Sequence, residues 1–148
     1  MNNKENLLKD LNVYLANLNV LNIKLHNYHW NVKGPGFFQL HEQFEVLYNQ
    51  AFSELDEVAE RILALGSHPA SSMKEYLELA TLKERASEAI NSLDSINEVK
   101  KDFQVMKDHA LSLIEASENA KDPVTADMFT GFAANYEKAL WMLNAYLG

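Results

Sequence analysis

Cysteine is absent from the 148 residues of this sequence. Disulfides, thiolate metal sites and thiol nucleophiles are therefore excluded from its chemistry. Long hydrophobic runs are absent too, because Asn, Lys or Glu interrupts every apolar stretch well short of the ~20 residues of a membrane span. The opening MNNKENLLKD has neither the basic start nor the apolar segment of a secretory signal. We therefore expect a soluble, cytoplasmic protein without membrane contact.

Positive charge is scarce: 13 Lys and Arg residues stand against 21 Asp and Glu residues, which gives a formal net charge of -8. Sequence-independent binding of nucleic acid depends on neutralising phosphates with Lys and Arg, so this composition argues against it. An acidic surface instead attracts cations. The hydrophobic share of 47% is enough for a substantial core, and we expect one domain over residues 1–148.

Apolar residues recur at helical spacing in four long segments, and no segment has a convincing strand pattern. The breaker Gly34-Pro35-Gly36 separates the first two segments, and Gly66 with Pro69 ends the second. Asp122-Pro123, an N-cap residue followed by proline, starts the last. The long helices are expected over about residues 4–33, 38–65, 95–119 and 122–147.

Two capping boxes mark further helix starts. Ser72 with Glu75 predicts a short helix that continues to about Ala80, and Ser95 with Glu98 predicts the start of the third long helix. The chain is then all-α, with a short extra helix in a long crossover between the second and third long helices. That order predicts a ferritin-like four-helix bundle.

The second long segment carries four possible metal ligands in two pairs, His41 with Glu45 and Asp56 with Glu60. Each pair is spaced i, i+4, so its members share one helix face. Within one helix the pairs cannot meet, because Glu45 and Asp56 lie eleven residues apart, or ~16 Å, while two bridged metal ions need ~4 Å. The position numbers of His41 and Glu60 add to the same total as those of Glu45 and Asp56. An antiparallel second copy with a two-fold axis near residues 50–51 would therefore complete both half-sites.

A third ligand comes from the first segment, since His29 and His41 lie six residues on either side of Pro35. A helical hairpin that turns there brings both imidazoles to one level. We predict a catalytic metal site shared between two subunits, with one supplying His29, His41 and Glu45 and the other supplying Asp56 and Glu60. Two imidazoles and three carboxylates suit iron.

Each of these residues alone has an ordinary explanation. A single helical histidine is more often a core or surface residue than a ligand, and an isolated Glu or Asp more often belongs to a solvated helix face. The two equal position totals favour the shared site. A di-iron centre inside one chain is disfavoured, because such bundles carry Glu-x-x-His motifs and this sequence has none.

Other histidines and the tryptophans receive no ligand role. His26 lies one turn before His29 and is read as a supporting or surface group, His68 as a loop residue, and His109 as part of the third long helix. For Trp30 and Trp141 we expect packing in the core or at an interface, while an electron-donor role stays open.

The segment HNYHWNVKGPGFFQLHEQFEVLYNQAFSELDEVAERI closely resembles the signature of the Dps family, the DNA-protecting mini-ferritins of bacteria. The family pattern is two histidines twelve apart, an acid four later, then Asp and Glu eleven and fifteen beyond that acid. It falls on the five ligands predicted above. One departure is Glu45, where the family usually carries Asp, and the added methylene could change the metal spacing or the occupancy of the second metal position.

This resemblance implies a homo-oligomeric shell of twelve subunits that binds Fe(II), up to two ions per two-fold interface. It further implies a ferroxidase that prefers hydrogen peroxide as oxidant and stores ferric mineral inside the shell. The residues from Trp141 to Leu147 also look like the family's last helix, and the likeness places Asp127, and less strongly Asp122, at a three-fold pore through which iron enters.

Many relatives bind DNA through a lysine-rich terminal extension, but here only Lys4 and Lys9 precede the body of the first helix. We therefore expect the ferritin-like type that does not bind DNA. Two other functions stay open at this point. One is a non-catalytic, DNA-associated or structural shell, and the other is a metal buffer that holds zinc or one iron per site.

Overall fold

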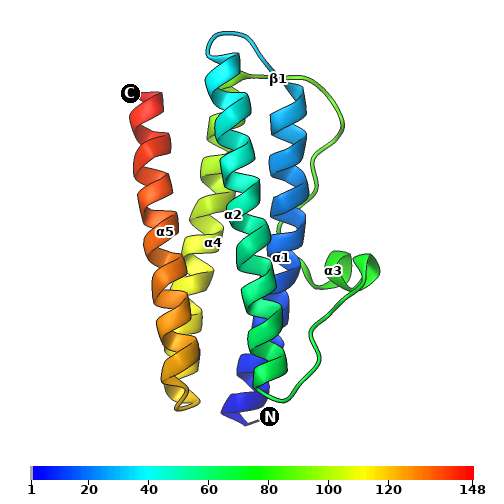
Figure 1. Ribbon diagram of the computed structural model, residues 1–148, viewed down its shortest axis with the longest axis vertical. Coiled ribbons are helices and arrows are strands. Elements are labelled where there is room, and N and C mark those ends of the chain that lie inside the picture. Colours follow the sequence, from blue (N-terminus) through cyan, green and yellow to red (C-terminus); the bar gives the residue numbers. More distant parts are fainter. Residues whose placement is uncertain (1) are drawn as a thin grey trace.

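Four long helices form the body of the computed structural model, which describes residues 2–148 (Figure 1). Helix α1 (Asn3–Asn31) and helix α2 (Phe37–Ala64) make one antiparallel hairpin, and α4 (Ser92–Asn119) and α5 (Pro123–Leu147) make the other. The two hairpins contact each other mainly through α1 and α4. The predicted all-α four-helix bundle is confirmed, and no helix among these residues is long and apolar enough to cross a membrane.

The predicted short helix is also present, as α3 (Met73–Leu79) in the crossover between the hairpins. The Ser72 side chain accepts a hydrogen bond from the Glu75 backbone N–H at 3.3 Å, and the Ser72 hydroxyl donates to the Glu75 carboxylate at 2.8 Å. The predicted cap at Ser72 is therefore present, although the Glu75 carboxylate accepts from the Ser71 N–H at 3.3 Å and not from the Ser72 N–H of a regular capping box. In Figure 1 the crossover leaves the end of α2, carries α3 along the outside of α1 and returns to the opposite end of the bundle.

Two details of this crossover differ from the prediction. Strand β1 (Val32–Lys33) pairs in parallel with strand β2 (Ile90–Asn91), so the chain does contain a short strand pair. In addition, α4 begins at Ser92, because Asn91 is its N-cap and accepts a hydrogen bond from the Asp94 N–H at 2.9 Å. The predicted cap at Ser95 is wrong, since Ser95 is fully buried and its hydroxyl donates to the Ser92 carbonyl.

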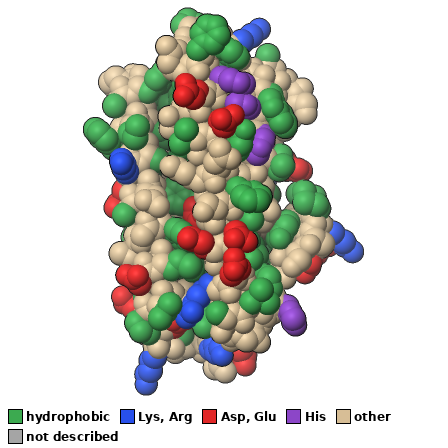
Figure 2. Space-filling model, viewed as in Figure 1, with side chains coloured by type: hydrophobic (Ala, Val, Ile, Leu, Met, Phe, Trp, Pro, Cys, Tyr) green, Lys and Arg blue, Asp and Glu red, His purple; other side chains and the backbone are tan. Residues whose placement is uncertain are grey.

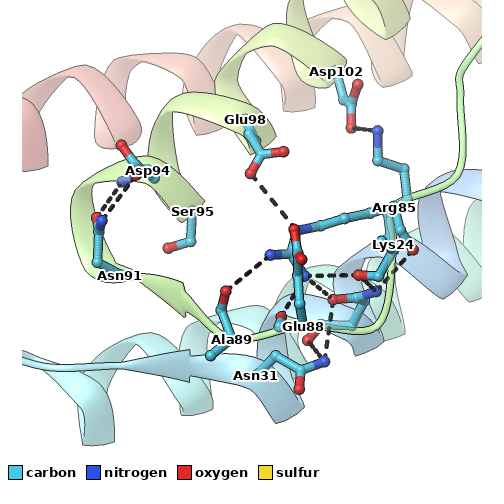
Figure 3. A network of polar contacts seen from close by, with 12 residues as sticks. Lys24, Asn31, Arg85, Glu88, Ala89, Asn91, Asp94, Ser95, Glu98 and Asp102 are labelled. Carbon is cyan, nitrogen blue, oxygen red and sulfur yellow. Dashed lines mark hydrogen bonds and ion pairs between the residues drawn. The ribbon is translucent and has the colours of Figure 1, made fainter.

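A polar network fixes the crossover to the bundle (Figure 3). The Arg85 guanidinium donates to the Asn27 side chain at 2.6 Å and to the Glu88 carbonyl at 2.8 Å, and it lies 3.8 Å from the Glu98 carboxylate. Beside it, Lys24 of α1 pairs with Asp102 of α4 at 2.7 Å, and both side chains are only 12% exposed. Burial raises the pKa of Asp102, and the Lys24 charge opposes that rise.

The core follows the leucine periodicity of α1. Six of its leucines are buried at relative exposures of 1% or less, namely Leu7, Leu11, Leu15, Leu18, Leu21 and Leu25. An open groove of about 780 Å³ runs between α2 and α5. In the space-filling view the hollow between these two helices has an apolar floor (Figure 2). None of the predicted ligand residues lines this groove within residues 2–148.

Candidate metal centre

The α1/α2 hairpin brings His29 and His41 together as predicted. The turn between the helices needs glycine, because Gly34 and Gly36 have φ values of +106° and +79°, a region that side chains with a Cβ avoid. The two imidazole rings stack with centroids 3.7 Å apart and planes within 13° of parallel. Figure 2 shows histidine side chains gathered toward one end of the face formed by α1 and α2.

Reciprocal hydrogen bonds fix the orientation of this histidine pair. His29 Nδ1 lies 2.6 Å from the His41 carbonyl oxygen, and His41 Nδ1 lies 2.7 Å from the His29 carbonyl oxygen. A carbonyl oxygen only accepts, so each Nδ1 must carry a proton. In the neutral ring each Nε2 then presents its lone pair, which is the arrangement of a metal-binding histidine supported by a backbone carbonyl.

Glu45 lies one turn beyond His41 on α2, and its carboxylate accepts a hydrogen bond from the Tyr48 hydroxyl at 3.3 Å. The Tyr48 ring stands edge-on to His29, with centroids 5.3 Å apart. Partial desolvation, and then the charge of Glu45, raise the pKa of Tyr48, so its phenol stays protonated and acts as the donor. Through Tyr48, Glu45 is therefore connected to the histidine pair.

Asp56 and Glu60 form the second group, one turn apart on the exposed face of α2. The side-chain hydrogen bond with Asp56, together with the Asp56 charge, raises the pKa of Glu60. Two carboxyl groups held this close repel each other when both are ionised, and a bound cation would relieve that repulsion. Figure 2 shows a group of acidic side chains on this face, below the histidines.

One chain does not bring the two groups together. Across residues 2–148, no cluster of three or more His, Asp or Glu side chains could hold a metal ion. The structure thus joins His29 to His41 and Asp56 to Glu60, and it leaves each group with too few ligands for a closed site. Their union across a subunit interface remains a prediction.

The two predicted pore residues have different surroundings. Asp122 caps α5 by accepting from the Thr125 N–H at 3.0 Å, and its carboxylate lies 3.0 Å from the Arg61 guanidinium. Burial alone would raise the pKa of Asp122, but the hydrogen bonds from Thr125 and the charge of Arg61 lower it overall. Asp127 is exposed and, with Glu57 and Glu60, lines an open groove of about 690 Å³.

Asp122 therefore already has a cationic partner, whereas exposed Asp127 makes no ion pair within residues 2–148. Asp127 also shares its groove with Glu60 of the predicted iron site. Of the two candidates, Asp127 is the one whose surroundings suit steering of iron, while the position of the pore itself remains a prediction.

A buried carboxyl group in the bundle escaped the sequence reading. Glu54 is 9% exposed, and both of its oxygens accept hydrogen bonds from tyrosines, Tyr14 of α1 and Tyr136 of α5, the latter at 2.9 Å. Burial raises the pKa of Glu54 from 4.5 to about 7. The helical spacing of apolar residues could have predicted this burial. Glu54 falls in the same series of buried α2 positions as Leu47, Ala51, Val58 and Ile62.

The tryptophans do not lie in the core. Trp30 is 69% exposed and Trp141 is 66% exposed, so the expectation of core packing is wrong for the single chain. Packing at an interface and the electron-donor role both stay open. The ring centroids of Trp30 and His26 lie 5.4 Å apart. The His26 ring in turn stacks on the Tyr48 ring, with centroids 3.7 Å apart. His26 is therefore part of the surroundings of Glu45, as a supporting group.

A family model described as a ferritin-like domain matches residues 8–148. DNA protection during starvation protein 2 of Bacillus anthracis is 42% identical over 142 residues, which cover 95% of this chain and 96% of that protein. The crystal structure of Dps from Staphylococcus aureus superposes with a TM-score of 0.95 at 41% identity, covering 100% of this chain and 99% of that one.

A third match is a Dps protein from Vibrio cholerae O1, described as a member of a broad superfamily of ferritin-like diiron-carboxylate proteins. It is 33% identical, with a TM-score of 0.94 and coverage of 99% of this chain and 91% of that one. These three similarities extend over nearly the whole chain, and the resemblance read from the sequence is confirmed.

Proposed function

The chain belongs to the Dps proteins of the ferritin-like family, and from this membership we propose that it stores iron and detoxifies it by oxidising Fe(II). The observation that carries the proposal is the reciprocally hydrogen-bonded pair His29 and His41, whose Nε2 atoms are left for a metal ion. A core or surface histidine needs no such arrangement. The diiron-carboxylate superfamily to which the Vibrio cholerae relative is assigned supports iron as the metal.

The ferroxidase site that we propose lies at a two-fold interface. An antiparallel second copy of α2 with its axis near residues 50–51 sets His41 against Glu60 of the partner subunit, and Glu45 against Asp56 of the partner subunit. The lack of a complete ligand cluster within residues 2–148 of one chain supports this division. So does Phe52, which is 64% exposed beside the proposed axis and would bury its ring in such a contact.

Fe(II) is the substrate of this site. Each metal position offers hard carboxylate oxygens and imidazole nitrogens, which accept both oxidation states of iron. Two Fe(II) ions give one electron each to hydrogen peroxide; with two protons taken up, the products are two Fe(III) ions and two water molecules. Delivery of both electrons together avoids release of a hydroxyl radical, and on this ground we propose peroxide rather than dioxygen as the preferred oxidant.

Storage requires a closed shell, for which we propose twelve copies, as the family resemblance implies. The groove lined by Glu57, Glu60 and Asp127 supplies carboxylates that would attract Fe(II) after it passes the proposed pore at Asp127. Asp122 is retained as a second pore residue of smaller effect, because Arg61 balances its charge. Asp127→Asn should slow iron uptake more than Asp122→Asn, measured as Fe(III) absorbance after addition of Fe(II) and peroxide.

The protective role in the relatives' name does not need contact with DNA. With a net charge of -8, we propose that this protein protects by removing iron and peroxide, in the cytoplasm where bacterial DNA lies. No retardation of DNA is expected in a gel-shift assay at physiological salt without free iron. A retarded band under those conditions would support the DNA-associated shell instead.

Site-directed variants separate the ferroxidase from a passive shell or a metal buffer. Purified apoprotein is loaded with Fe(II) without oxygen, peroxide is added, and ferric absorbance is followed while light scattering gives the particle mass. His41→Ala and Asp56→Ala should each abolish rapid oxidation. His68→Ala and Glu42→Ala change an exposed histidine and an exposed acid outside the proposed site and should not. Oxidation no faster than in buffer, or unchanged in the first two variants, would refute the catalytic proposal.

A further inference from the structure

Glu45 differs from the other four proposed ligands in how its own chain holds it. His29 and His41 fix each other through their backbone carbonyls, whereas Asp56 and Glu60 lie one turn apart on the exposed face of α2. Glu45 is exposed and meets none of these residues in a hydrogen bond within residues 2–148. Its one side-chain hydrogen-bond partner there is the hydroxyl group of Tyr48, 3.3 Å from Oε1.

The Tyr48 ring is itself firmly placed. His26 stacks on its face with centroids 3.7 Å apart and planes within 15° of parallel, and the His29 ring lies nearly perpendicular to it with centroids 5.3 Å apart. Asn22 of α1 contacts both Tyr48 and His26 through hydrogen bonds. Its side-chain amide donates to the Tyr48 backbone carbonyl at 2.7 Å, and its own backbone carbonyl oxygen lies 2.8 Å from His26 Nδ1.

The hydroxyl of Tyr48 therefore has a defined position relative to the histidine pair, because the two histidine rings that pack against its ring both belong to α1. A glutamate has one more rotatable bond than an aspartate, so it loses more conformational freedom when a metal ion orders it. A donor that occupies one carboxylate oxygen beforehand reduces that loss and leaves the other oxygen for the ion.

We propose that Tyr48 is a positioning residue that holds Glu45 ready for metal binding, and that His26 and Asn22 hold Tyr48. The inference rests on the proposed function, since it concerns the same metal site. In this assignment His26 supports Tyr48 and does not itself bind the metal ion. Tyr48 does not touch the metal ion in this assignment, and it acts only through the carboxylate of Glu45.

Cobalt(II) without peroxide is the probe, because its visible absorption reports coordination geometry and requires no turnover. Tyr48→Phe removes the hydroxyl and keeps the ring and its stacking. Loss of a group that supports a ligand typically weakens metal binding 10- to 100-fold. For this single, long hydrogen bond we expect ~10-fold weaker Co(II) binding at the position that Glu45 serves, with an altered absorption band.

A double-mutant cycle tests whether Tyr48 acts through Glu45. In a Glu45→Ala background the hydroxyl has no carboxylate to hold, so Tyr48→Phe should change neither the Co(II) affinity nor the spectrum. It should also be silent in Glu45→Asp, whose shorter side chain withdraws the carboxylate from the hydroxyl. The same loss in all three backgrounds would overturn the proposal, as would an unchanged affinity and spectrum in Tyr48→Phe alone.

Two controls keep the result specific. Tyr146→Phe removes the hydroxyl of a tyrosine that is 44% exposed near the end of α5, and it should leave Co(II) binding unchanged. Thermal unfolding and particle mass of apo Tyr48→Phe should match those of the unmodified protein, which excludes a folding defect. If Co(II) binding survives in His41→Ala and Asp56→Ala, the shared site itself is wrong. If Co(II) binding is lost in those two variants but is unchanged in Tyr48→Phe, only the positioning role of Tyr48 is refuted.

Discussion

Glu54→Gln should stabilise this protein above neutral pH, because it removes an acid that the fold keeps away from water. The pKa of Glu54 is raised from 4.5 to about 7, first of all by burial. Each pKa unit corresponds to ~1.4 kcal/mol, so the ionised carboxylate costs the folded chain about 3 kcal/mol relative to the unfolded one. Solvent screens this cost only slightly, because Glu54 is 9% exposed.

The contribution of Glu54 to the stability of the folded chain falls with rising pH because the folded and unfolded chains bind different numbers of protons. Between pH 4.5 and about 7 the folded chain holds a proton on Glu54 that the unfolded chain has released. The contribution of Glu54 to stability is therefore fully present below pH 4.5 and is lost as pH rises through about 7. Glutamine stays neutral throughout. Both tyrosine hydroxyls donate to the Glu54 carboxylate in the structure. Glutamine, like the protonated acid, has one donor group and one acceptor oxygen, so one tyrosine hydroxyl then accepts while the other still donates.

Thermal unfolding of apoprotein at one fixed protein concentration tests this from about pH 4.5 to 8.5. The advantage of Glu54→Gln should grow from near zero to about 3 kcal/mol, or roughly 6–12 °C in Tm for a chain of this length. Glu42→Gln, an exposed acid on the same helix, should show no such trend. An advantage that stays constant or shrinks as pH rises would refute the assignment of a buried, proton-holding Glu54.

Two further predictions concern the α1/α4 contact and the proposed histidine ligands. Lys24→Met leaves Asp102 buried without its cation. This variant should lower the free energy of unfolding by ~3 kcal/mol in urea titrations. Combining Lys24→Met with Asp102→Leu should recover most of that loss, because no charge is then left buried. Metal binding at His29 and His41 needs a lone pair on each Nε2, so Co(II) affinity should fall when pH is lowered from about 7.5 to about 5. Equal affinities at the two pH values would count against imidazole ligands.

Much of the backbone could be read from the sequence because its signals act over a few residues. Proline and two glycines with positive φ turn the chain after α1, and Asp122 followed by Pro123 starts α5. The predicted start of α4 was wrong because a contact between residues far apart in the sequence decides it. Ser95 with Glu98 has the pattern of a capping box, but pairing of β1 with β2 brings the chain to Asn91, which caps the helix one turn earlier.

The candidate site divides in the same way. Helix periodicity alone placed His41 with Glu45 and Asp56 with Glu60, since residues four apart share a face in any helix. The sequence by itself thus determined the helices and the two pairs of proposed ligands. Only the tertiary structure decided how these side chains are held, through the exchange of hydrogen bonds between His29 and His41 and the placement of Tyr48 by α1. It also decided that Glu54 lies between two tyrosines. Those contacts join residues that are 12 to 82 positions apart, and packing between helices, rather than local propensity, brings them together.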